Sequence, residues 1–193
     1  MASDPLILGF DTSAAHCAAA LLCGDRLLGS VAQEMTRGQA EELMPILEAL
    51  LKEHDLSWKD LNVIGVGIGP GNFTGIRISV SAARGLALAL GIPTIGVSTF
   101  EASLHGISGP TVASVPAPRN QQYILEPQKE AVLHQGVFET TLPVVIPPAA
   151  DELATNIAYV ARERMHHETA RPAPLYIRAA DAAPSRDIPP QIL

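Results

Sequence analysis

Cysteine is scarce in this chain of 193 residues, which contains only Cys17 and Cys23. Two cysteines cannot build the disulfide framework on which small secreted domains depend. If both lie on one strand, six residues at about 3.3 Å per residue hold them too far apart to bridge. A metal site is also disfavoured, because no pair of histidines accompanies the C-x5-C spacing. We interpret both side chains as reduced, small and buried, as in a cytoplasmic protein.

Positive charge and long apolar runs are also in short supply. Lysine and arginine total 13 against 20 acidic residues, so the net charge of −7 opposes nonspecific binding to nucleic acid. No signal-peptide pattern follows Met1. No apolar stretch is expected to reach the roughly 18 residues of a membrane span, because the run before Gly91 ends too early. The hydrophobic content of 47% predicts instead a globular protein with a substantial core and no membrane association.

Glycine and proline divide the chain into two halves. Twelve of the 15 glycines precede residue 100, and 12 of the 16 prolines follow it. The first half therefore indicates compact strands and helices, and the second indicates short elements joined by proline-containing turns. We predict an α/β domain over residues 1–105 and a shortened second α/β domain over residues 106–193.

The central feature of the first half is the stretch from Val63 to Leu90, which is predicted to form a strand, a turn and a helix. Branched aliphatic residues alternate with glycine over residues 63–68, which is typical of a strand covered on both faces. A glycine-rich turn follows, and Thr74 is the expected N-cap of a helix over residues 75–90. Apart from Arg77 and Arg84 this helix is apolar nearly all round. We therefore expect it to be buried nearly all round and to contact more than its own sheet.

The glycine turn that precedes this helix has two interpretations. Free amides and the positive end of a helix favour anions, so the turn could hold a phosphate. Alternatively, Gly69, Gly71 and Gly75 only allow tight backbone geometry and close packing. The known phosphate motifs are not matched, because the spacing is G-x-G-x-x-x-G and no lysine occurs between Lys59 and Lys129.

Alternating and helical periodicities predict the remaining elements. Strands are expected at residues 6–10, 14–22, 26–33, 61–69 and 92–97, and further helices at 39–54 and 99–105. The order is therefore β-β-β-α-β-α-β-α, and three antiparallel strands before the first helix argue against a simple doubly wound fold. The second half is predicted to contain strands at 111–115, 122–126 and 131–140 and a helix at 151–167.

This order, with Asp-Thr-Ser after the first strand, resembles one half of the actin-like ATPase (ASKHA, ribonuclease H-like) fold. Three segments narrow the resemblance: LGFDTSAAHCAAAL, EELMPILEALL and VGIGPGNFTGIRISVSAARGLALALGIPTIGVSTFEA. They are similar to the TsaB (YeaZ) family, bacterial proteins needed for threonylcarbamoyladenosine in tRNA and formerly labelled glycoproteases. The match covers residues 6–105 well. APLYIRAADAAP near the end of the chain is like the family's closing strand, which implies that residues 175–178 return to the first domain.

The resemblance implies a noncatalytic partner of TsaD, in the complex that adds threonylcarbamoyl to adenosine 37 of tRNAs. The implied partners are TsaD in a heterodimer, TsaE in the larger complex and a second copy of the chain in isolation, with tRNA contacted only indirectly. The implied interface lies on two helices and comprises Gln39, Leu43, Leu47, Leu50, Arg77, Val80, Arg84 and Ala87. We expect no catalytic residue, cofactor or metal, and a cytoplasmic location.

The resemblance also implies a vestigial phosphate site formed by Asp11, Thr12, Ser13, Gly69, Gly71, Asn72 and Thr74. In actin-like ATPases an aspartate in the place of Asp11 helps to bind metal and phosphate, whereas here it could simply close an Asx turn. Pro116 stands where the family has an aspartate, and the H-x-x-x-H motif of TsaD is missing from the first helix. An ATP-dependent phosphotransferase or ATPase is the alternative function. A peptidase ranks third, because the sequence shows neither a metal-binding pair nor an activated nucleophile.

Overall fold

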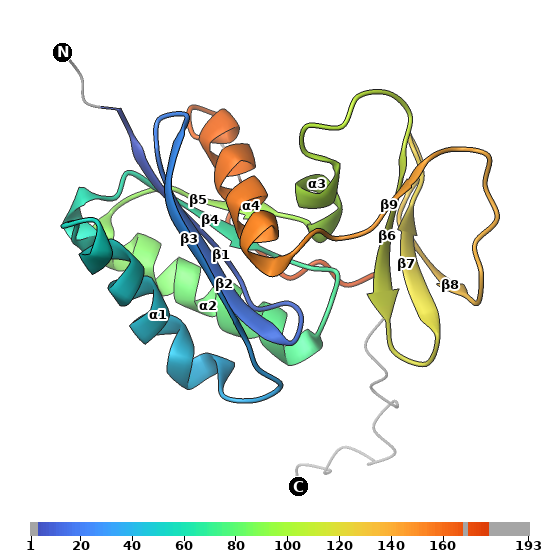
Figure 1. Cartoon of the computed structure of the whole chain (residues 1–193), viewed down its shortest axis with the longest axis horizontal. Helices are drawn as coiled ribbons and strands as arrows, with labels where there is room; N and C mark the ends of the chain where they lie inside the picture. The colour runs from blue at the N-terminus through green and yellow to red at the C-terminus, as the bar shows by residue number, and fades with distance from the viewer. Residues whose placement is uncertain (1–3, 168–169, 178–193) are drawn as a thin grey trace, which may run out of the picture.

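The computed structural model describes residues 4–167 and 170–177, which form one sheet of five strands and one of four (Figure 1). The larger sheet is built from β1 (Leu6–Asp11), β2 (His16–Cys23), β3 (Arg26–Glu34), β4 (Val63–Gly67) and β5 (Thr94–Val97). Its spatial order is β3-β2-β1-β4-β5. The β1–β2 and β2–β3 pairs are antiparallel, and the β1–β4 and β4–β5 pairs are parallel. This arrangement is the actin-like, ribonuclease H-like α/β fold, so the predicted fold class is confirmed.

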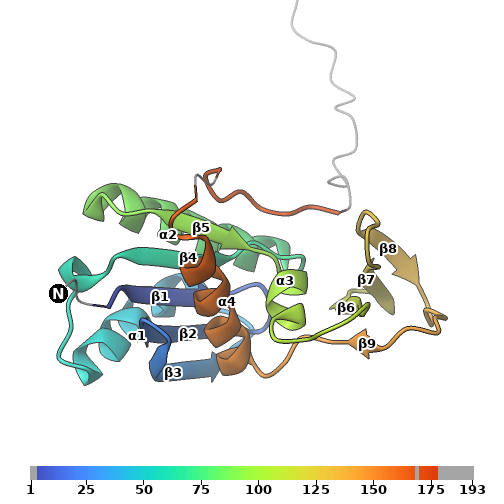
Figure 2. The same ribbon diagram turned by 90° about the horizontal axis from the view of Figure 1, so that it is seen from above.

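Helices cover both faces of the larger sheet. α1 (Gln39–Glu53) and α2 (Phe73–Leu90) lie on one face, and α4 (Ala150–Arg164) lies on the other (Figure 2). Successive strand residues point to opposite faces, so β1 contributes Leu8 to the core under α1 and α2 and Ile7 to the core under α4. A 3-10 turn, η1 (Trp58–Asp60), precedes β4, and the short helix α3 (Thr99–Leu104) follows β5.

Glycine allows α4 to lie directly on the larger sheet. A Cβ at Gly9 would be 2.6 Å from the carbonyl oxygen of Ala154, and one at Gly65 would be 2.7 Å from Cβ of Ala161. The helix predicted at residues 151–167 is therefore confirmed with slightly different ends, but it packs on the first sheet although it follows the second sheet in the sequence. The domain boundary near residue 105 stays a prediction.

The smaller sheet contains β6 (Val112–Ala117), β7 (Gln121–Leu125), β8 (Val132–Gln135) and β9 (Val144–Val145), in the order β8-β7-β6-β9. The strand predicted at 131–140 ends early, because the chain turns at Gly136, where φ is 80°. β9 was not predicted: it pairs with β6 over only two residues, which leaves no periodicity to detect. Phe100 of α3 packs on one face of this sheet with Ala113 and Val115.

The start and the burial of α2 both differ from expectation. Asn72, rather than Thr74, is the N-cap, and its Oδ1 accepts a hydrogen bond of 2.9 Å from the amide of Gly75. The prediction that this helix is buried nearly all round is wrong for the chain alone. The buried residues of this 18-residue helix are five: Gly75, Ile76, Ser79, Val80 and Ala83.

Length and hydropathy alone would let α2 cross a membrane, contrary to the expectation that no apolar run is long enough. Its inner side packs on β4, and the hydroxyl of Ser79 donates a 3.0 Å hydrogen bond to the carbonyl oxygen of Gly67. These contacts are those of a helix that covers a sheet with its inner side.

The C-terminal segment 170–177 connects the two sheets (Figure 2). The amide of Leu175 donates a 2.8 Å hydrogen bond to the carbonyl oxygen of Ile68, at the end of β4. The side chains of Leu175 and Ile177 pack on the core of the smaller sheet. The predicted return of residues 175–178 to the first domain stays a prediction, and Arg178 lies outside the described residues.

Candidate functional site

Two loops that were predicted to form a phosphate site meet at the ends of β1 and β4. The amide of Asn72 donates a 2.6 Å hydrogen bond to the carbonyl oxygen of Ser13, and the hydroxyl of Thr12 donates one of 2.6 Å to the carbonyl oxygen of Gly75. A Cβ at Gly71 or Gly75 would collide with the Thr12–Ser13 backbone. The close approach of the two loops therefore explains these two glycines without a bound phosphate.

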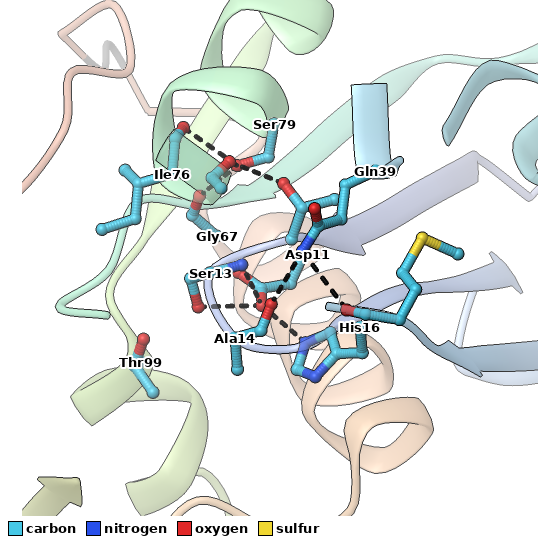
Figure 3. A network of polar contacts seen from close by, with 12 residues as sticks. Asp11, Ser13, Ala14, His16, Gln39, Gly67, Ile76, Ser79 and Thr99 are labelled. Atoms are coloured by element: carbon cyan, nitrogen blue, oxygen red, sulfur yellow. Dashed lines mark hydrogen bonds and ion pairs between the residues drawn. The ribbon is translucent and has the colours of Figure 1, made fainter. Parts of the chain in front are cut away.

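Asp11 is fully buried beneath these loops (Figure 3). Its Oδ2 accepts hydrogen bonds of 2.9 Å each from the amide and hydroxyl of Ser13, which forms the expected Asx turn. A third contact of 2.9 Å joins Oδ2 to Nε2 of His16. Its Oδ1 has no hydrogen-bond partner in the described part of the chain and faces Gly67, where a Cβ would collide with it. The carboxylate is thus held by its own loop and by His16.

The contact between Asp11 and His16 was not predicted from the sequence. The side chain of His16 is only 12% exposed and begins β2, just after the turn that follows β1. In the sequence, this contact corresponds to a histidine that stands five residues after an aspartate, with a tight turn between two antiparallel strands separating them. That spacing becomes informative only when the turn is known to bring the two side chains to the same face.

A cleft of about 880 Å³ lies between the two sheets, next to these loops. Of the seven residues predicted for the phosphate site, four line it: Ser13, Gly71, Asn72 and Thr74. Asp11, Thr12 and Gly69 lie behind its surface. Its lining also contains two aromatic rings, Phe73 and Tyr123, and several prolines, including Pro116. Within the described residues no lysine, arginine, aspartate or glutamate lines the cleft, and His16 is its only ionisable side chain besides Tyr123.

The described residues do not offer a metal centre. Among residues 4–167 and 170–177, no three side chains of histidine, cysteine, aspartate or glutamate are grouped so that they could hold a metal ion. The two cysteines lie on β2 and are free, as predicted, but Cys23 is only half-buried. Burial, assisted by the carboxylates of Asp11 and Glu42, raises the pKa of the Cys17 thiol to about 11. Cys17 therefore remains a protonated thiol near neutral pH.

The residues predicted for the helix interface fall into two groups. Leu43, Leu47, Leu50 and Val80 point into the core beneath the sheet and are not at the surface, so this part of the prediction is wrong for the isolated chain. Gln39, Arg77, Arg84 and Ala87 are at least partly exposed. A helical face that is broadly apolar does not by itself tell which apolar side chains point inward.

Arg77 has partners within the chain. Its guanidinium lies 3.9 Å from the ring centroid of Phe73, and its Nε donates a 3.0 Å hydrogen bond to the hydroxyl of Tyr176. The rings of Phe73 and Tyr176 are stacked with centroids 5.1 Å apart. The C-terminal segment is thereby attached to the first turn of α2, beside the mouth of the cleft.

Known proteins with the same architecture identify the family. A sequence model of TsaD, described as tRNA N6-adenosine threonylcarbamoyltransferase, matches residues 26–182. TsaB of Escherichia coli K12 is 33% identical over 129 residues, which are 64% of this chain and 55% of that protein. TsaB of Bacillus subtilis is 37% identical over 95 residues, which are 49% of this chain and 42% of that protein. The chain belongs to the TsaD family of this model, on its TsaB (YeaZ) branch.

Solved structures of TsaB (YeaZ) proteins share the fold. YeaZ from Pseudomonas aeruginosa superposes with a TM-score of 0.72 at 23% sequence identity, over 89% of this chain and 99% of that one. The chain spans about half the length of the two curated TsaB relatives described above. The curated relatives are named for the biosynthesis of threonylcarbamoyladenosine in tRNA.

Proposed function

We propose that this TsaB-family chain is a noncatalytic partner of TsaD in the synthesis of threonylcarbamoyladenosine in tRNA. The observation that carries the proposal is the uncovered side of α2. Leu88 is 86% exposed on this helix, although the helix is apolar over most of its length. Contiguous exposed apolar surface marks contacts with other proteins, and Leu88 adjoins the exposed small residues Gly85 and Ala89 of the same helix.

The outer face of α2, defined here as Ser81, Gly85, Leu88 and Ala89, is suited to helix packing. All four residues are exposed, and three of them are small. A Cβ at Gly85 would meet no other atom within 4 Å, so another backbone can approach there. Two helices that present small residues to each other can pack closely, and a second copy of the same face can do so around a two-fold axis.

This geometry supports the partners implied by the family. We propose a heterodimer with TsaD through the outer face of α2, with TsaE joining the larger complex and tRNA contacted only through that complex. In isolation the same face pairs with a second copy of the chain. The site of action is the cytoplasm, where the partners and the tRNA substrate meet.

The experiment compares two apolar surface residues of equal exposure. Leu88 and Val137 are each 86% exposed, but Val137 lies near the smaller sheet. We expect Leu88→Asp to weaken binding of TsaD at least tenfold in isothermal titration calorimetry, since it places a charge in the contact. Val137→Asp should bind as the wild type does. Equal affinities of the two variants for TsaD would contradict the proposal.

The alternative function, an ATP-dependent phosphotransferase or ATPase, has one observation in its favour. The loop that follows Asp11 meets the glycine loop of residues 69–72 beside the cleft, through the hydrogen bond from the amide of Asn72 to the carbonyl oxygen of Ser13. The absence of cationic side chains from the described lining of the cleft favours the noncatalytic proposal. Turnover of ATP by the isolated chain, lost in Asp11→Ala, would establish the alternative.

A further inference from the structure

The cleft between the sheets has a fixed polar centre at His16. Nε2 of this ring is 2.9 Å from Oδ2 of the buried Asp11. Because a carboxylate oxygen accepts hydrogen bonds, Nε2 is the nitrogen that carries the hydrogen. The second ring nitrogen, Nδ1, has no hydrogen-bond partner among the described residues, and the His16 side chain lines the cleft. In the neutral ring Nδ1 is an acceptor, and the contact with Asp11 fixes the direction in which it points.

The rest of the cleft is apolar or neutral. Phe73 and Tyr123 supply aromatic rings, and Pro116, Pro118 and Pro147 supply apolar walls without amide hydrogens. The N-terminus of α2 also reaches the cleft. The side chain of its N-cap, Asn72, accepts the amide hydrogen of Gly75, whereas the amides of Phe73 and Thr74 remain open to an acceptor atom of a ligand. No lysine or arginine of the described chain lines the cleft, so a phosphate entering it would lose water without gaining a cation.

We propose that this cleft binds an uncharged heteroaromatic ligand of nucleoside size and excludes nucleoside phosphates. The volume of about 880 Å³ is in the range of pockets that hold small molecules. The ligand ring lies against Phe73 or Tyr123, and its amino group donates a hydrogen bond to Nδ1 of His16. Asp11 positions His16 and does not itself touch the ligand. This proposal is independent of the partnership with TsaD.

Adenosine, AMP and ATP test the proposal, because they share one ring and differ in charge. Each is titrated into the full-length chain, with and without Mg²⁺, and binding is followed by calorimetry and by protein NMR shifts. We expect adenosine to bind at least tenfold more tightly than AMP or ATP. Tightest binding of ATP, or no binding of adenosine, would overturn the proposal.

Three variants place the site in the cleft. His16→Ala should weaken adenosine binding at least tenfold, whereas His134→Ala, which alters a histidine outside the cleft, should leave it unchanged. Because His16→Ala also removes a partner of the buried Asp11, Tyr123→Leu serves as a second variant that keeps apolar volume and removes the ring. Adenosine binding that survives both cleft variants unchanged would overturn the proposal.

Discussion

The two faces of the larger sheet are covered in different ways. On one face, α4 buries six of its 15 residues: Leu153, Ala154, Ile157, Ala158, Val160 and Ala161. It lies so close that Gly9 and Gly65 leave no room for a side chain. On the other face, α2 buries five of 18 residues and leaves Leu88 almost fully exposed. The difference shows that α4 completes the core of this chain, whereas α2 has a core side and an exposed side on which Leu88 and small residues lie beside Arg77 and Arg84.

Hydrophobicity by itself does not distinguish these roles. α2 is the more apolar helix by composition, yet it is the one with the larger uncovered side. The decisive features are the positions of small residues: glycine on the strands beneath α4 brings that helix inward, whereas Gly85 and Ser81 lie on the outer face of α2. Small residues on a sheet favour close packing inside the chain, and small residues on an exposed helix face favour packing against another helix.

The largest difference in unfolding free energy is expected between a variant with a charge on the buried side of α2 and one with a charge on its exposed side. Val80 is buried and 3% exposed, so Val80→Glu should lower the free energy of unfolding by at least about 3 kcal/mol, because the carboxylate finds no partner in the core. Leu88→Glu should change it by less than about 0.5 kcal/mol at protein concentrations low enough that the compared proteins are monomeric. Urea denaturation of both variants measures the contrast. Similar losses of stability would mean that the outer face of α2 is covered within the chain.

The same substitution at two glycines should have opposite effects. Gly9→Ala places a Cβ against the backbone of α4 and should cost about 1–3 kcal/mol of unfolding free energy. Gly85→Ala meets no neighbouring atom and should add up to about 1 kcal/mol, because alanine favours helix. Thermal and urea unfolding give the sign of each change. A stable Gly9→Ala variant would contradict the close packing of α4.

The sequence predicted most elements of the fold, because their periodicity is local. It did not predict which side of α1 and α2 points inward: Leu43 and Leu47 were assigned to an interface and lie in the core. That choice depends on how the helix is rotated about its axis over the sheet, which apolar periodicity over a broad face does not fix. β9 escaped prediction because two residues paired with β6 carry no pattern.

Part of the candidate site was likewise predictable. The loops after β1 and before α2 were identified, since an Asp-Thr-Ser turn and a glycine turn are visible in the sequence. The role of His16 was not, because its contact with Asp11 depends on the conformation of the turn between them. The cleft could not be predicted from the sequence either, because its walls come from segments more than 100 residues apart, such as Ser13 and Tyr123.

A smaller change in stability is expected at the contact between α3 and α4, which Glu101 and Arg164 form. Burial by itself raises the pKa of Glu101, but the hydroxyl and amide of Ser98 and the guanidinium of Arg164 together hold it below its ordinary value. A carboxyl with a lowered pKa stabilises the fold above its unfolded pKa, about 4.3, and loses this contribution as pH falls through the lower folded value.

Glu101→Gln should therefore cost at most about 1 kcal/mol at pH 7, because glutamine can keep the hydrogen bonds to Ser98 but loses the partly exposed ion pair with Arg164. The difference in unfolding free energy between wild type and variant should shrink as the pH falls below about 4. Urea denaturation from pH 7 to pH 3 measures it. A difference that is independent of pH would show that the charge of Glu101 does not stabilise the contact between α3 and α4.

The solution mass of the isolated chain tests most directly whether the outer face of α2 is an interface. Analytical ultracentrifugation at matched concentrations compares the wild type, Leu88→Asp and Val137→Asp. We expect the wild type and Val137→Asp to have twice the chain mass of 20.4 kDa, and folded Leu88→Asp to have the mass of one chain. One mass shared by all three proteins, whether that of one chain or of two, would contradict it.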